Sequence, residues 1–87
     1  MASYRVEITA SAEKALARLP KDDMTRVVRA IPALTTEPRP GGCRRLKGHE
    51  DIYRIRVGLC RVIYSIEIRR IVVVVLKLGH RKDVYRR

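Results

Sequence analysis

Two alternating segments joined by a tight turn constrain the fold more than any other feature of the sequence. Apolar and polar residues alternate over residues 52–57 and again over residues 60–67, and Gly58-Leu59 lies between them. A two-residue loop with glycine first is typical of a type II′ hairpin turn. Such a turn fixes the register, and one face of the hairpin then pairs Val57 with Cys60, Ile55 with Val62, and Tyr53 with Tyr64.

The other face of this predicted hairpin is basic. It pairs Arg56 with Arg61, Arg54 with Ile63, and Ile52 with Ser65. Like charges directly opposite each other destabilise a hairpin, by about a few tenths of a kcal/mol. The face is either a solvated arginine surface or a cradle for an anion such as phosphate, which guanidinium groups bind with two hydrogen bonds. The apolar face should meet the helices.

The first half of the chain predicts a strand and two helices. Residues 4–9 alternate as a half-buried strand does. Ser11 can cap a helix that ends at Pro20, and a second helix should start near Asp22 or Asp23. Pro32 lies inside this second helix and should kink or end it. The two helices would form an antiparallel hairpin that covers a sheet.

The second half predicts further strands. Residues 44–47 are a short candidate, Ile68-Arg69 is a turn, and residues 71–78 are almost entirely apolar. Such a run is typical of a central strand that is covered on both faces. We therefore expect an α+β fold, with an antiparallel meander and an N-terminal helical hairpin on one face. Residues 1–87 should form a single domain.

Charge is concentrated in the strand-rich half. The chain has 20 Lys and Arg against 9 Asp and Glu, a net charge of +11. Residues 39–87 hold 14 of these cations and 4 of the acids, which is a net +10. An excess of this size points to a polyanionic partner, either a nucleic acid or an acidic protein.

Several classes of protein are excluded or disfavoured. The longest apolar run, residues 71–76, is too short to span a bilayer, and the N-terminus lacks a signal-peptide pattern, so we expect a cytoplasmic protein with no membrane partner. Cys43 and Cys60 fit no zinc-binding spacing, even together with His49 and His80, and are best read as reduced apolar fillers. We expect no metal and no cofactor.

Four stretches carry a resemblance to a known family. They are residues 38–48 (PRPGGCRRLKG), 53–58 (YRIRVG), 61–64 (RVIY) and 79–85 (GHRKDVY). In this order and spacing the chain resembles the RelE/ParE superfamily of bacterial toxins, and within it the RelE-type toxins of toxin–antitoxin pairs. The resemblance implies a fold like that of the microbial ribonucleases and cleavage of mRNA in the ribosomal A site. It also implies a cognate antitoxin, the ribosome and mRNA as partners, with DNA reached only through the antitoxin.

By position, the resemblance carries the family's site onto Arg54, Arg56, Arg61, Arg81 and Tyr85. Some members have lysine where this chain has Arg54 and Arg56. The expected reaction is attack of a ribose 2′-OH on the adjacent phosphate, which needs no metal. Arginine is too rarely deprotonated to act as the base, so that role falls to Tyr85, His80, or the RNA and ribosome. The additional RNA-binding residues that we expect are Arg44, Arg45, Lys47 and Lys82.

Two other functions remain open from the sequence. A ParE-like inhibitor of DNA gyrase would use the same fold, although it would have no need for the hairpin arginines together with Arg81 and Tyr85. A basic nucleic-acid-binding domain without catalysis would explain the charge alone. Gyrase inhibition causes DNA damage, whereas an mRNA-cleaving toxin stops protein synthesis first.

Overall fold

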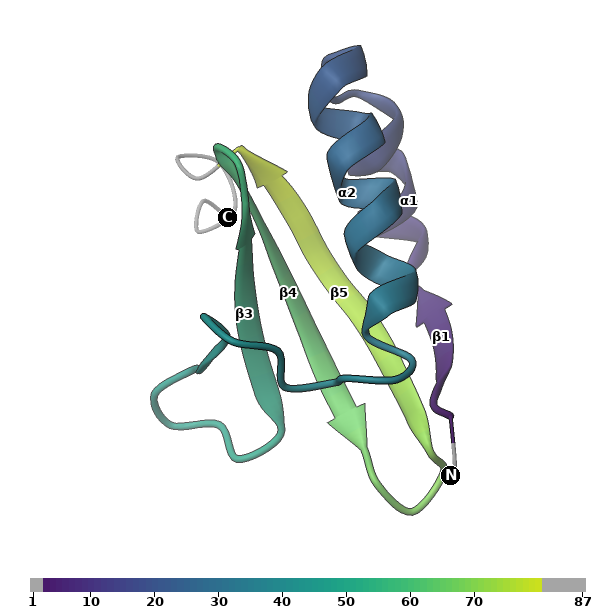
Figure 1. Ribbon diagram of the computed structural model, residues 1–87, viewed down its shortest axis with the longest axis vertical. Coiled ribbons are helices and arrows are strands. Elements are labelled where there is room, and N and C mark those ends of the chain that lie inside the picture. Colours follow the sequence, from purple (N-terminus) through teal and green to yellow (C-terminus); the bar gives the residue numbers. More distant parts are fainter. Residues whose placement is uncertain (1–2, 81–87) are drawn as a thin grey trace.

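A five-stranded sheet with two helices on one face makes up the computed structural model, which describes residues 3–80 (Figure 1). The helices are α1 (Ala10–Ala17) and α2 (Lys21–Ala33). The strands are β1 (Arg5–Ile8), β2 (Arg44–Arg45), β3 (Ile52–Val57), β4 (Cys60–Glu67) and β5 (Val72–His80). Their order in the sheet is β1-β5-β4-β3-β2, so the predicted α+β class is confirmed.

The β3–β4 hairpin has the register predicted from its turn. All six pairs agree, from Val57 opposite Cys60 to Ile52 opposite Ser65. Gly58 has a φ of 62°, which glycine adopts without strain, and Leu59 keeps an ordinary negative φ. This combination is that of a type II′ turn, and it matches the right-handed twist of the two strands.

The first strand departs from a simple meander. Strands β2 to β5 pair antiparallel in order, as predicted, whereas β1 pairs parallel with β5. β5 is therefore a central strand, but among the described residues the helices cover only one of its faces (Figure 1). The expectation of cover on both faces is wrong for Lys77, which is exposed. Val72, on the same face at the start of β5, is fully buried, so the expectation holds at that end of the strand.

The helix ends differ slightly from the predicted ones. Thr9, and not Ser11, caps α1: its hydroxyl accepts a hydrogen bond from the Ala12 amide at 3.1 Å and donates one to the Leu76 carbonyl at 3.0 Å. Thr9 thus joins the helix to β5, which Ser11 cannot do from the first turn. α2 begins at Lys21, directly after Pro20, and ends one residue beyond Pro32.

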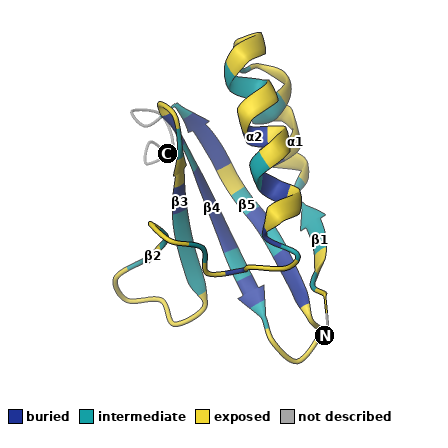
Figure 2. Ribbon diagram, in the orientation of Figure 1, coloured by how far each residue is buried: buried dark blue, intermediate teal, exposed yellow. Residues whose placement is uncertain are grey.

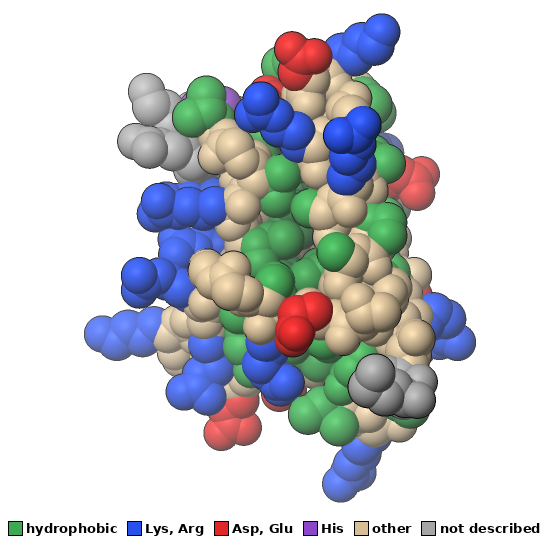
Figure 3. Space-filling model, viewed as in Figure 1, with side chains coloured by type: hydrophobic (Ala, Val, Ile, Leu, Met, Phe, Trp, Pro, Cys, Tyr) green, Lys and Arg blue, Asp and Glu red, His purple; other side chains and the backbone are tan. Residues whose placement is uncertain are grey.

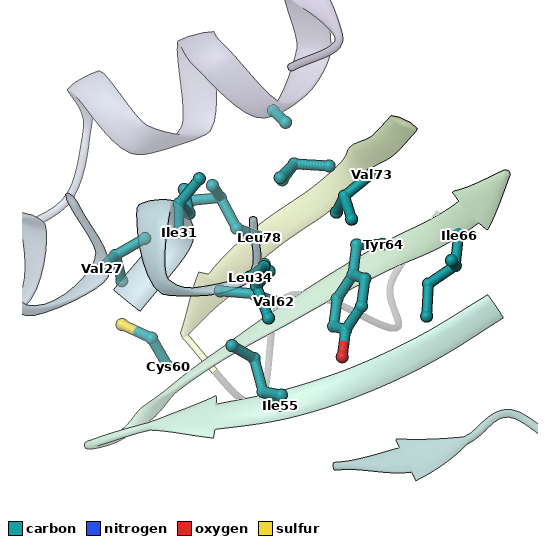
Figure 4. Close-up of a cluster of buried hydrophobic side chains, with 12 residues drawn as sticks. Val27, Ile31, Leu34, Ile55, Cys60, Val62, Tyr64, Ile66, Val73 and Leu78 are labelled. Atoms are coloured by element: carbon teal, nitrogen blue, oxygen red, sulfur yellow. The ribbon is translucent and has the colours of Figure 1, made fainter. Parts of the chain in front are cut away.

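The core lies between the helices and the sheet. Its buried side chains come from the predicted apolar face of the hairpin, from β5 and from the helices (Figures 2 and 4). Tyr64 is fully buried, and its hydroxyl donates a 2.7 Å hydrogen bond to the Pro38 carbonyl. Tyr4 and Tyr53 pack against the same cluster. Tyr64 is therefore a core residue, and Tyr4 and Tyr53 lie partly buried at the edge of the core.

Candidate functional site

Cations line one end of the sheet face that points away from the helices. The register pairs Arg56 with Arg61 and places Arg44 of β2 opposite Arg54 of β3. Lys77 of β5 lies opposite Ile63, the neighbour of Arg54 across the hairpin. We call these five residues, Arg44, Arg54, Arg56, Arg61 and Lys77, the cationic face. Figure 3 shows Lys and Arg side chains gathered along the side of the molecule where β2 and β3 lie in Figure 2.

Lys77 was not predicted as a site residue, and a β-bulge explains why. The β4–β5 pairing is regular except between Ile63 and Tyr64, where β5 contributes one extra residue. Tyr64 lies opposite Val75, so simple alternation would place Lys77 on the helix side as well. The bulge turns Lys77 to the opposite face instead. No pattern in the local sequence predicts a bulge at this position.

The surroundings of Arg54 indicate what the cationic face can bind. Its side chain is only partly exposed, and its Nε atom is buried without a hydrogen-bond partner among the described residues. A buried donor without an acceptor costs about 1–3 kcal/mol. A bound anion would provide the acceptor and would also offset the repulsion between Arg54 and Arg44. The geometry therefore suits this face to phosphate oxygens.

The remaining predicted residues are more scattered. Arg45 lies opposite Tyr53 and so on the other side of β2, while Lys47 belongs to the loop after β2, where residues 45–50 line a recess of about 500 Å³. His80 lies opposite Cys60, at the end of β5 on the helix side. It is therefore not on the cationic face. Three predicted residues, Arg81, Lys82 and Tyr85, lie outside the described part of the chain.

One further cation reaches the tip of the hairpin from α2. A Cβ atom on Gly58 would lie 3.0 Å from a terminal nitrogen of Arg26. Arg26 therefore packs directly over the β3–β4 turn, close to where the cationic face begins. No local pattern in the sequence predicts this contact, since it depends on how α2 packs against the sheet.

The other candidate reactive groups are poorly suited to chemistry. Burial raises the pKa of the Cys60 thiol and of the Tyr64 hydroxyl, so both groups stay protonated at neutral pH. Within residues 3–80 there is no group of three or more His, Cys, Asp or Glu side chains that could hold a metal ion. The same part of the chain has no helix that is long and apolar enough to cross a membrane.

An apolar recess opens on the helix side of the sheet. It has a volume of about 440 Å³ and lies between the C-terminal half of α2, the loop at residues 40–42 and β3. Figure 3 shows hydrophobic side chains at the surface in the centre of this view. The lining residues are Ala30, Ala33, Leu34, Pro40, Gly41, Gly42, Ile55, Arg56 and Val57. Arg56 connects this recess to the cationic face.

Comparison with known proteins places the chain in a family. Residues 6–85 match the family described as the ParE toxin of the type II toxin–antitoxin system parDE. The chain is 33% identical to the toxin RelG of Mycobacterium tuberculosis, over 97% of this chain and 98% of that protein. It is 30% identical to a protein named RelE1 of Methanocaldococcus jannaschii, over 95% and 96% of the two chains.

A solved structure agrees with these matches. The archaeal RelE–RelB complex from Pyrococcus horikoshii contains a chain that is 37% identical, with a TM-score of 0.81 over 93% of this chain and 98% of the other. The similarity thus covers the sheet, both helices and the hairpin that carries the cationic face. The chain belongs to the RelE/ParE superfamily of toxins from type II toxin–antitoxin systems.

Proposed function

We propose that this protein is a toxin that cleaves mRNA on the ribosome, with the cationic face as its RNA site. The observation that carries the proposal is the double pairing of arginines, Arg56 with Arg61 and Arg44 with Arg54, on one face of the sheet. Like charges directly opposite each other repel, so the pairing of arginine with arginine does not itself stabilise the sheet. Guanidinium groups in this arrangement suit a phosphodiester whose negative charge increases in the transition state.

The reaction follows from these residue types. The 2′-oxygen attacks the adjacent phosphorus as its proton passes to a general base, the bond to the 5′-oxygen breaks, and that oxygen takes up a proton. The products carry a 2′,3′-cyclic phosphate and a 5′-hydroxyl. Arg54, Arg56 and Arg61 hold the phosphate and stabilise the added charge. The toxin would need the ribosome to splay the message and align the 2′-OH. Its site of action is accordingly the cytoplasm.

The general base is proposed to be Tyr85. His80, the other candidate, lies on the helix side of the sheet and away from the arginines. Tyr85→Phe should reduce single-turnover cleavage on programmed ribosomes by about 10²–10⁴-fold, whereas His80→Ala should reduce it less. Because phenylalanine keeps the ring, a rate close to that of the parent would assign Tyr85 to base stacking, and the proton would then pass to the RNA or ribosome.

Gyrase inhibition is the second candidate, because the matched family description names ParE. Expression of the toxin alone in bacteria distinguishes the two. We expect growth to stop within minutes, with amino-acid incorporation falling before any DNA-damage response or filamentation. The reverse order would favour gyrase. Normal growth at verified expression, without an antitoxin, would contradict both.

A cognate antitoxin is the proposed partner, as the relative from Pyrococcus horikoshii was solved in complex with RelB. The apolar recess beside α2 suits an amphipathic antitoxin helix, and the net charge of +11 favours an acidic one. Ala33→Arg should therefore abolish rescue by the antitoxin while the toxin stays active. Thr25→Arg, on an exposed part of α2 outside the recess, is the matched control and should leave rescue intact. Rescue that survives in Ala33→Arg would place the antitoxin elsewhere.

A further inference from the structure

The segment between α2 and β2 crosses the sheet before it reaches the cationic face. Residues 34–43 run from the end of α2 toward β2 and pass in front of β5 and β4 in Figure 1. We call this segment the strap. Pro38, at its middle, is buried, and its carbonyl accepts the 2.7 Å hydrogen bond from Tyr64. Figure 4 shows the Tyr64 hydroxyl pointing away from Val73 and out of the core cluster.

A second tyrosine holds the next residue of the strap. The Arg39 Nε donates a 3.0 Å hydrogen bond to the Tyr53 hydroxyl, and the guanidinium carbon lies 5.3 Å from the Tyr53 ring centre. Tyr53 and Tyr64 are direct cross-strand partners, and their rings stack at 6.0 Å with an interplanar angle of 24°. Two adjoining phenols on β3 and β4 therefore anchor two consecutive strap residues.

The strap leads directly into β2, which carries Arg44. β2 has only two residues, and one of them places its cation opposite Arg54. A ladder of that length, with like charges in register, is too weak to set its own position. A shift of one residue would turn Arg44 to the other face of the sheet. The anchors on Pro38 and Arg39 lie only five or six residues before Arg44, so they limit such a shift.

We propose that Tyr64 is a positioning residue for the RNA site: its buried hydrogen bond to Pro38, supported by the Arg39–Tyr53 pair, fixes the strap and thereby holds Arg44 beside Arg54. The proposal rests on the proposed function in that it treats Arg44 as an RNA contact. Tyr64 itself touches no RNA, because it is fully buried on the helix side. Its effect on RNA should therefore pass through Arg44.

A double-mutant cycle tests this coupling. The affinity of a single-stranded RNA 12-mer is measured across a range of salt concentrations for the parent, Tyr64→Phe, Arg44→Ala and the double variant. Loss of one charged contact should weaken binding by about tenfold and lower the salt slope by about 0.7. Tyr64→Phe should reproduce this change, and the double variant should bind no worse than Arg44→Ala. The proposal would be overturned if Tyr64→Phe weakened RNA binding by the same factor in the parent and in Arg44→Ala.

A structural control separates positioning from loss of stability. Ile66→Val alters a buried residue on the same strand, costs about 0.5–1.5 kcal/mol and leaves the Tyr64–Pro38 hydrogen bond in place. Amide hydrogen exchange over residues 38–46 should rise in Tyr64→Phe and not in Ile66→Val. Unchanged exchange in Tyr64→Phe would overturn the proposal even if the protein cleaves RNA. A third outcome is that exchange rises in Tyr64→Phe and the binding losses of Tyr64→Phe and Arg44→Ala are non-additive, while the parent protein cuts no mRNA. That combination would contradict only the proposed function.

Discussion

The sheet face that points away from the helices carries different arrangements of charge at its two ends. At the end near the β4–β5 turn, cations alternate with acids: Arg5 pairs with Glu7 at 3.1 Å, and Arg70 reaches Glu67 at 3.2 Å and Glu7 at 3.5 Å. At the hairpin end, arginine faces arginine in two places. The basic composition alone therefore does not explain the cationic face. The same surface pairs cations with acids where no ligand is proposed, and it places arginine opposite arginine where RNA is proposed to bind.

The largest expected difference between the two ends appears when one arginine is removed from each. Arg61→Ala should lower single-turnover cleavage of ribosome-bound mRNA by about 10²–10³-fold, because it deletes a transition-state contact. Arg70→Ala, the matched control, deletes the ion pairs with Glu7 and Glu67 at the other end and should change the rate less than threefold. Thermal unfolding should stay similar in both variants, since exposed ion pairs contribute about 0–1 kcal/mol. Unfolding of Arg61→Ala would instead make Arg61 a structural residue.

A smaller difference between the two ends should appear in RNA affinity. Arg54→Ala should weaken binding of a single-stranded RNA by about tenfold and lower its salt slope by about 0.7, because one phosphate contact is lost. Arg5→Ala removes the same side chain from the balanced end and should alter neither quantity appreciably. Filter binding at several salt concentrations measures both. Equal effects of the two variants would show that RNA affinity depends only on the net charge of the protein.

The smallest effect concerns stability and belongs to the balanced end. Ile71, in the turn before β5, has a φ of 54°, a conformation that costs a β-branched residue about 1–2 kcal/mol. Ile71→Gly should relieve this strain and, after the backbone entropy of glycine, raise stability by up to about 1 kcal/mol. Thermal unfolding should show a rise of a few degrees with unchanged cleavage. A loss of stability would mean that packing of the partly exposed Ile71 side chain outweighs its strain.

Much of the cationic face could be predicted because a short turn fixes a register. Gly58-Leu59 leaves one way to pair the flanking strands, so the opposition of Arg56 and Arg61 follows from counting residues. Lys77 could not be found in this way, since the bulge beside Tyr64 depends on how β5 fits between two neighbours. Arg26 was missed for a related reason. Its contact with Gly58 depends on the placement of α2, which no local pattern encodes.

The fold shows the same division between local and long-range information. Periodicity located the helices and most of the strands, whereas the parallel pairing of β1 with β5 brings together residues more than 60 positions apart. The cap of α1 was misassigned because Thr9 gains a second partner, the Leu76 carbonyl, that only the folded sheet provides. The position of His80 on the helix side likewise follows from the β4–β5 register and not from its proximity to Arg81 in the chain.

Cleavage of a defined message on programmed ribosomes tests the central claim most directly. The message carries either ribose or a single 2′-deoxyribose at the nucleotide in the A site, and gyrase supercoiling is assayed with the same protein preparation. We expect the ribose message to be cut to a 2′,3′-cyclic phosphate and a 5′-hydroxyl, the deoxy message to stay intact, and supercoiling to proceed normally. An uncut ribose message together with inhibited supercoiling would contradict the account and assign the cationic face to a protein target.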